Sequence, residues 1–195
     1  MRRPDVLKLS ADNSTVIGVT NKGVSYISIP DSIQTIGRGA FGRCRELATI
    51  HIPDSVTTIS PGAFYGCTAL VNIDIPNSVT KIEDCAFEEC SALVEIDIPK
   101  GVTTIEPSVF RGCSELESVR IPEGVKSIGP FAFYGCYALK HIKIPNSVTS
   151  IGNGAFRCCS ALESIEIPNS VTHIGEAVFA GCACLKKYTC TPEHA

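Results

Sequence analysis

The feature that most constrains the fold of this chain is a motif that recurs every 23 residues. Seven isoleucines at that spacing are each followed by proline: Ile29, Ile52, Ile75, Ile98, Ile121, Ile144 and Ile167. A cysteine, a phenylalanine and a leucine column keep the same period, running from Cys44, Phe41 and Leu47 to Cys182, Phe179 and Leu185. Because so short a unit cannot bury an apolar face by itself, it must stack on its neighbours, and the pattern predicts a solenoid.

The repeat also predicts what one coil contains. Residues 141–144 alternate polar and apolar side chains, which is typical of a half-buried strand, and Pro145 ends the strand because proline has no N–H to donate. Phe156, Cys159 and Leu162 then recur every three residues, a spacing that fits a tight helical turn with one buried face. Stacked coils would place a parallel sheet on one side of the solenoid and short helical turns on the other.

The two ends depart from the repeat. Residues 6–19 lack the cysteine and phenylalanine columns, and two apolar runs separated by residues 11–14 predict a hairpin that covers the first coil. We therefore divide the chain into a capping hairpin with the first strand (1–28), seven 23-residue repeats (29–189) and a tail (190–195). The last coil has no obvious polar cap. Either its strand edge is bare, which favours end-to-end self-association, or the chain is part of a longer protein.

The pattern Leu-x-x-Ile-x-Ile resembles the leucine-rich repeat. The 23-residue length and the wording Ile-Pro-x-Ser-Val-Thr-x-Ile-Gly…Ala-Phe-x-Gly-Cys-x-x-Leu resemble the BspA-like, or Treponema pallidum-type, branch of that family from about Val24 to Tyr188. The resemblance implies an α/β repeat solenoid: a right-handed leucine-rich-repeat coil with a parallel sheet on one face and short helical turns on the other. It also implies surface or secreted adhesion-type proteins of bacteria or of parasitic and commensal protists, which attach to host or bacterial surface proteins.

Composition argues against several classes of function. With 17 basic and 20 acidic residues, the net charge is −3, so the chain lacks the basic surface that nucleic-acid binding needs. No apolar run approaches the roughly 18 to 20 residues that span a bilayer, so we expect no membrane insertion. Polar residues follow the initial Met-Arg-Arg, and no signal peptide is visible. Localisation therefore stays open, since the family resemblance alone implies the cell surface.

The 11 cysteines call for an explanation, and most belong to the repeat. No Cys-x-x-Cys occurs, and the four histidines do not pair with cysteines at zinc-ligand spacing, so we expect no metal and no cofactor. The Cβ atoms of adjacent ladder cysteines would lie about 4.8 Å apart, beyond the roughly 3.5–4.5 Å usual in a disulfide, which favours buried thiols that pack as small hydrophobes. Four cysteines lie off the ladder: Cys85, Cys158, Cys184 and Cys190. The sequence leaves open whether Cys184 and Cys190 form a disulfide at the C-terminal end.

The sequence contains no recognisable catalytic motif. A glycine-rich phosphate loop, a His-Glu-x-x-His helix and a nucleophile elbow are all missing, and most glycines occupy repeat columns. We therefore expect a protein that is not an enzyme.

Specificity is expected where the repeats differ from one another. Two columns flank the first isoleucine of Ile-x-Ile-Pro and point to the outer sheet face, and their candidate partner-binding residues are Tyr26, His51, Asp74, Glu95, Asp97, Arg120, His141, Lys143 and Glu166. An acidic patch is thus followed by a basic one. One interpretation is a solvated face on which opposite charges pair across strands, each pair stabilising the fold by less than about 1 kcal/mol. However, like charges also lie on adjacent coils, where they oppose folding. This favours the other interpretation, a docking surface whose charge order selects the partner.

A second candidate surface lies on the side of the predicted helical turns. Phe131, Tyr134 and Tyr137 recur at three-residue spacing and avoid the core column. They would share an outward face, where clustered aromatics can bind a partner or can merely shield the backbone.

The sequence therefore predicts a non-enzymatic protein–protein interaction scaffold of the adhesion type that binds through its variable sheet face. Two alternatives remain: an intracellular adaptor or effector module with the same binding logic, and a structural spacer whose sheet face binds nothing.

Overall fold

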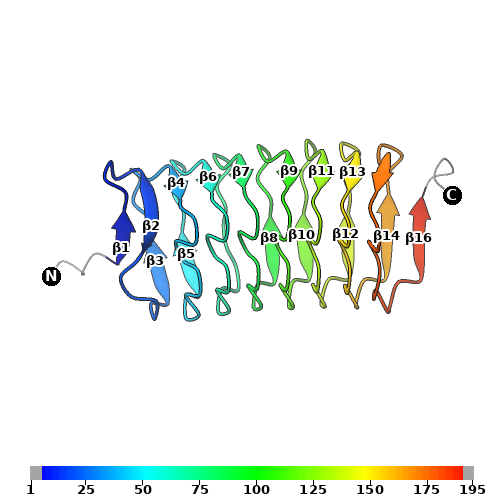
Figure 1. Ribbon diagram of the computed structural model, residues 1–195, viewed down its shortest axis with the longest axis horizontal. Helices are drawn as coiled ribbons and strands as arrows, with labels where there is room; N and C mark the ends of the chain where they lie inside the picture. Colours follow the sequence, from blue (N-terminus) through cyan, green and yellow to red (C-terminus); the bar gives the residue numbers. More distant parts are fainter. Residues whose placement is uncertain (1–5, 191–195) are drawn as a thin grey trace.

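The computed structural model describes residues 6–190, with side chains described as far as Lys186. Within this range the chain winds into a rod of stacked coils, with the N-terminal hairpin at one end and the last coil at the other (Figure 1). The architecture is a parallel-strand solenoid.

The coils contribute strands to two parallel sheets with gaps in their ladders, where the sequence predicted one sheet; the coil of Asp74 adds only an isolated bridge to the first. The first sheet, in the lower half of Figure 1, contains β3 (Tyr26–Ser28), β5 (Thr49–His51), β8 (Glu95–Asp97), β10 (Ser118–Arg120), β12 (His141–Lys143), β14 (Ser164–Ile167) and β16 (Lys187–Cys190). The second sheet, in the upper half, contains β2 (Thr15–Val19), β4 (Thr35–Ile36), β6 (Thr58–Ile59), β7 (Lys81–Ile82), β9 (Thr104–Ile105), β11 (Ser127–Ile128), β13 (Ser150–Ile151) and β15 (His173–Ile174).

A hairpin begins the solenoid. Strand β1 (Leu7–Leu9) pairs antiparallel with β2, and β2 pairs parallel with β4 on its other side. The hairpin therefore extends the second sheet by one antiparallel strand and covers the edge that the first coil would otherwise expose.

The core lies between the two sheets and the turns that close each coil. The phenylalanine column forms one continuous stack from Phe41 to Phe179, with successive ring centroids 5.2 to 5.9 Å apart. Phe110, Cys113 and Leu116 are each fully buried, as are their equivalents in most coils. The three-residue recurrence thus marks the buried positions of the closing segment.

The predicted helical turns are wrong: the closing segments described in the structure contain turns and no helix. Two residues per coil, four apart, adopt the left-handed conformation, as in Phe131 (φ 56°) and Gly135 (φ 72°). The Tyr134 N–H donates back to the Phe131 carbonyl (3.1 Å), but the Phe131 N–H donates to the Asn153 carbonyl of the next coil (3.0 Å). Because left-handed residues interrupt a right-handed helix, the backbone alternates between bonds within a coil and bonds between coils.

The ladder cysteines are buried except Cys182 in the last coil, which is partly buried, and their thiols also form hydrogen bonds. From Cys67 to Cys182, each Sγ–H donates to the carbonyl of the phenylalanine 26 residues earlier, at 3.1 to 3.2 Å. The ladder therefore satisfies backbone carbonyls inside the core as well as filling space. The side chain of Cys190 lies outside the described residues, so the bridge to Cys184 stays a prediction.

The stacking is loosest between the third and fourth coils, counted from β3. The second sheet is interrupted between β7 and β9. In the first sheet the same two coils share one isolated bridge, between Asn72 and Glu95. A small apolar void lined by Ile82, Val102 and Phe110 lies between them.

Candidate binding groove on the first sheet

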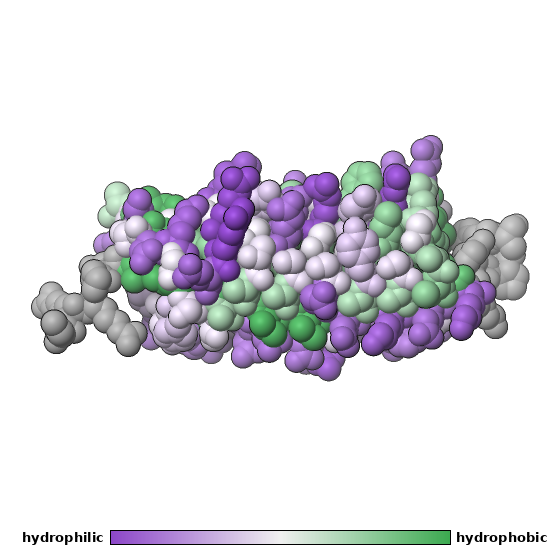
Figure 2. Space-filling view, turned by 90° about the horizontal axis from the view of Figure 1, so that it is seen from below, coloured by the Kyte–Doolittle hydropathy of each residue, from purple (hydrophilic) through white to green (hydrophobic). Residues whose placement is uncertain are grey.

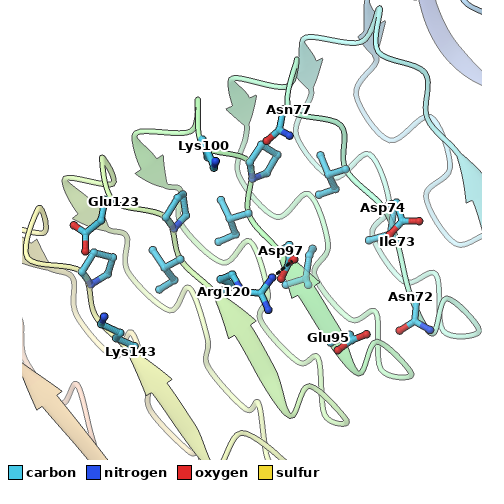
Figure 3. Close-up of a pocket in the computed structure, with 17 residues that line it drawn as sticks. Asn72, Ile73, Asp74, Asn77, Glu95, Asp97, Lys100, Arg120, Glu123 and Lys143 are labelled. Atoms are coloured by element: carbon cyan, nitrogen blue, oxygen red, sulfur yellow. Dashed lines mark hydrogen bonds and ion pairs between the residues drawn. The ribbon is translucent and has the colours of Figure 1, made fainter.

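An open groove with a volume of about 920 Å³ crosses the first sheet. Its lining runs from Asn72 to Pro145 and spans four successive coils, including the loose seam described above. Figure 3 shows its side chains projecting from the strands and from the turns that follow them. By contrast, the underside of the rod carries weakly polar and apolar atoms along its middle, and hydrophilic atoms gather along its edges (Figure 2).

Strand alternation explains how the groove obtains its polar side chains. In β8, Ile96 is buried whereas Glu95 and Asp97 on either side of it are exposed. The same exposed–buried–exposed pattern holds in β10 and β12, so Arg120 and Lys143 stand outward as well. Proline then ends each strand, and Pro99, Pro122 and Pro145 add apolar surface to the lining.

The four central charges form one row along the rod axis. Asp74, Asp97, Arg120 and Lys143 are spaced by 23 residues and line the groove in that order. In the middle of the row, Arg120 Nη1 donates to Asp97 Oδ2 at 2.5 Å (Figure 3). The two side chains are 80% and 68% exposed, so the pair contributes less than about 1 kcal/mol to stability.

A second row of polar residues forms the rim above the strands. Asn77, Lys100 and Glu123 follow the Ile-Pro of three successive coils and are all exposed. Sequence reasoning missed this row, although its signal was available, because the residue after Ile-Pro also varies between coils. On the rim the charge order is reversed: Lys100 follows Asp97 in one coil, and Glu123 follows Arg120 in the next.

The hydrogen-bonded ladder of the first sheet is interrupted where like charges meet. In the described chain, β8 pairs with β10 and β12 pairs with β14, but no pairing joins β10 to β12, where Arg120 and Lys143 are neighbours. The seam between Asp74 and Asp97 keeps only the bridge at Asn72. Two of the gaps therefore lie beside like charges on adjacent coils, which oppose pairing slightly. A third gap, between β5 and the coil of Asp74, has no such pair.

The structure separates the predicted sheet-face residues into two groups. Asp74, Glu95, Asp97, Arg120 and Lys143 line the groove. The other four lie on the same sheet and are exposed, but they do not line it: Tyr26, His51, His141 and Glu166. Their role in binding stays a prediction.

The aromatic candidates lie on the closing turns. Phe131 and Tyr134 meet edge to face, with ring centroids 6.1 Å apart. The Arg111 Cζ atom lies 5.6 Å from the Tyr134 ring centroid, and Arg111 Nη1 donates to Glu88 Oε1 at 2.5 Å. Tyr134 is half-buried. Tyr137 is 53% exposed. Only Phe131 and Tyr137 therefore present much aromatic surface, and the three rings do not form one exposed face.

Neither a metal cluster nor a membrane-spanning helix is found between residues 6 and 190. No group of three or more His, Cys, Asp or Glu side chains there is placed to hold a metal ion. No helix in that range is long and apolar enough to cross a membrane.

Comparison with known proteins identifies the repeat. The chain matches the BspA type Leucine rich repeat region in six copies, over residues 20–116 and 92–194. It is similar to a leucine-rich repeat protein from Eubacterium ventriosum (28% identity, TM-score 0.85), covering 97% of this chain and 50% of that one. It is also similar to the T. pallidum Leucine Rich Repeat protein (28% identity, TM-score 0.83), covering 94% of this chain and 88% of that one.

A third solved structure is more distant. A leucine rich cell surface protein from Faecalibacterium prausnitzii is 25% identical with a TM-score of 0.60, and the match covers 95% of this chain and 74% of that one. The chain thus spans half the length of the Eubacterium protein. No curated protein matches it. The matched region includes every coil that forms the groove, and the chain belongs to the BspA-type leucine-rich repeat family.

Proposed function

We propose that this protein is a non-enzymatic interaction scaffold of the adhesion type, which binds a protein partner through the groove on the first sheet. The observation that carries the proposal is the placement of like charges on adjacent coils at Asp74 and Asp97 and again at Arg120 and Lys143. Like charges directly opposite one another cost stability, and here the strand ladder is interrupted beside them. These charges are therefore better explained by binding, because the order of charges on a surface selects a partner with complementary charges and raises its association rate.

The two alternatives make different predictions about this surface. A structural spacer gains nothing from like charges on adjacent coils, so the groove favours a binding function over a spacer. An intracellular adaptor or effector would use the same groove, and only location separates it from an adhesin. The cell-surface description of the Faecalibacterium relative supports the adhesin.

The test compares the partners captured by three forms of the protein. The groove variant carries Asp74→Lys, Glu95→Lys and Asp97→Lys. The control variant carries Glu46→Lys, Glu115→Lys and Glu163→Lys, which are exposed, lie outside the groove and make the same change in net charge. Circular dichroism and thermal melting first establish that both variants are folded. Bound proteins are then identified by mass spectrometry at two salt concentrations.

We expect partners that are retained by wild type and the control, are lost by the groove variant and bind more weakly at high salt. If both variants lose the same partners, net charge and not the groove governs binding, which contradicts the proposal. If the groove variant keeps every partner, the binding surface lies elsewhere, and Phe131 and Tyr137 are the next residues to change. If no form captures a partner, the spacer is favoured.

A further inference from the structure

We propose that the groove accepts an extended polypeptide segment in which a basic and an acidic side chain lie four residues apart. This inference rests on the proposed function and specifies the partner of the same groove. It follows from where the groove has unbalanced charge.

The middle of the groove carries charges of both signs that nearly cancel: Glu95, Asp97 and Glu123 against Lys100 and Arg120. The coil of Asp97 also carries Lys100 on the rim, and the coil of Arg120 also carries Glu123. Asp97 and Arg120 are in addition paired with each other. A ligand charge placed over these two coils would meet both signs at similar distance and gain little.

The ends of the groove carry charge that the protein does not neutralise. Among residues whose side chains are described, neither Asp74 nor Lys143 forms an ion pair within 4.0 Å. The exposed Glu95, in the coil of Asp97, is bridged to Asn72 in the coil of Asp74 and leaves a net negative charge on the acidic half of the groove. Glu166 adjoins Lys143 in the register of β12 and β14, but it does not line the groove. A complementary ligand therefore places a cation at Asp74 and an anion at Lys143.

The distance between these ends sets the spacing in the ligand. Asp74 and Lys143 are three coils apart, and at about 4.8 Å a coil this is about 14 Å. An extended chain advances about 3.4 Å per residue, so about four residues cover that distance. Residues four apart in an extended chain also point to the same side, so both charges can face the groove at once.

A helical ligand fits this spacing poorly. An α-helix advances only about 6 Å over four residues, so its charges would have to lie about nine residues apart. Between the charged ends lie the exposed, paired Asp97 and Arg120, and Pro122 is partly exposed beside them. In an extended segment the residue midway between its two charges also faces the groove, over this neutral pair.

The test is a selection of random 12-residue peptides displayed on phage against the whole immobilised protein. The same library is selected against Asp74→Lys, against Lys143→Glu and against the double variant Asp74→Lys/Lys143→Glu. Both positions are exposed, and thermal melting verifies that each variant is folded. Affinities of the enriched peptides are then measured by fluorescence anisotropy with synthetic copies.

Wild type should enrich peptides with Lys or Arg and Asp or Glu four positions apart. Each single variant should weaken their binding about five- to tenfold. Asp74→Lys should instead enrich peptides with two acidic residues at that spacing, and Lys143→Glu peptides with two basic residues. The double variant should recover the mixed peptides, because a segment that runs in the opposite direction meets the exchanged charges.

Two results would overturn the inference. One is enrichment of peptides whose charges show no preferred spacing or do not follow the variants. The other is no enriched peptide at all, which rules out a linear segment as the partner. In that second case the capture experiment with the groove variant still decides the proposed function, since a folded partner could bind the same groove.

Discussion

The buried cysteine ladder makes the stability of this protein sensitive to alkaline pH. Burial raises the pKa of Cys67 to about 12. Burial likewise raises the pKa of four further ladder thiols: Cys90, Cys113, Cys136 and Cys159. In the unfolded chain these thiols lose their protons near pH 8.5. Between that pH and their raised values, the folded protein holds protons that the unfolded chain has released.

The sign and size of the effect follow from proton linkage. The contribution of each thiol to stability is fully present below about pH 8.5, and it is lost as the pH rises toward the folded-state pKa. Each thiol lowers the free energy of unfolding by about 1.4 kcal/mol per pH unit in this window, so five lower it by about 7 kcal/mol per pH unit. Few domains have more than 15 kcal/mol of total stability, so we expect unfolding to set in between pH 9 and about 10.5.

Urea unfolding under reducing conditions at intervals from pH 8 to 10, followed by circular dichroism, measures this slope. Cys113→Ala should lower stability at every pH, because it leaves a cavity, but it should reduce the slope by about 1.4 kcal/mol per pH unit. Cys184→Ala should leave the slope unchanged, since that thiol is exposed. If Cys113→Ala keeps the wild-type slope, the ladder thiols are not the groups that couple stability to pH, and the reasoning is refuted.

Two further predictions concern packing and use the same unfolding assay. Phe110→Ala removes a buried ring that is stacked on both sides and should lower the free energy of unfolding by about 3–5 kcal/mol. Asp97→Ser on the exposed face should change it by less than about 1 kcal/mol. Equal losses of stability would mean that the buried and exposed faces are wrongly assigned. Gly152→Ala would place a Cβ 2.5 Å from the Pro130 nitrogen and should cost about 1–3 kcal/mol, because backbone must shift. Gly39→Ala meets no atom within 4 Å and should cost about 1 kcal/mol for its left-handed backbone alone, so a smaller loss in Gly152→Ala than in Gly39→Ala would contradict the stacking distance.

The error in predicting helical turns has a specific physical cause. A recurrence of three residues is shared by a tight helix and by successive turns closed by hydrogen bonds between residues three apart. What separates them is the left-handed conformation of two residues per coil. Glycine indicates this conformation and occupies about half of these positions, including Gly112 and Gly135, but Ser108, Phe131 and Ala177 also adopt positive φ. Residue type therefore marked only part of the positions where the backbone leaves the helix.

The sequence predicted the central charged residues of the candidate site, but it did not predict which of them pair with one another or how far the groove extends. The variable columns identified Asp74, Asp97, Arg120 and Lys143, because solvent-facing positions escape the constraint that holds the core columns constant. They could not show that Arg120 bonds to Asp97 and leaves Lys143 unpaired. That choice depends on which neighbouring strands approach closely.

The sequence by itself determined the period, the stacked coils, the buried columns and the alternation that turns charged side chains outward, because each of these repeats identically with every coil. Only the tertiary structure decided the second parallel sheet, the Sγ–H bonds of the cysteine ladder and the groove with its paired centre and unpaired ends. These features depend on contacts between one coil and the next, where bonds join residues 23 to 26 positions apart in the chain. Their geometry is set by the packing of both coils, so no single repeat contains it.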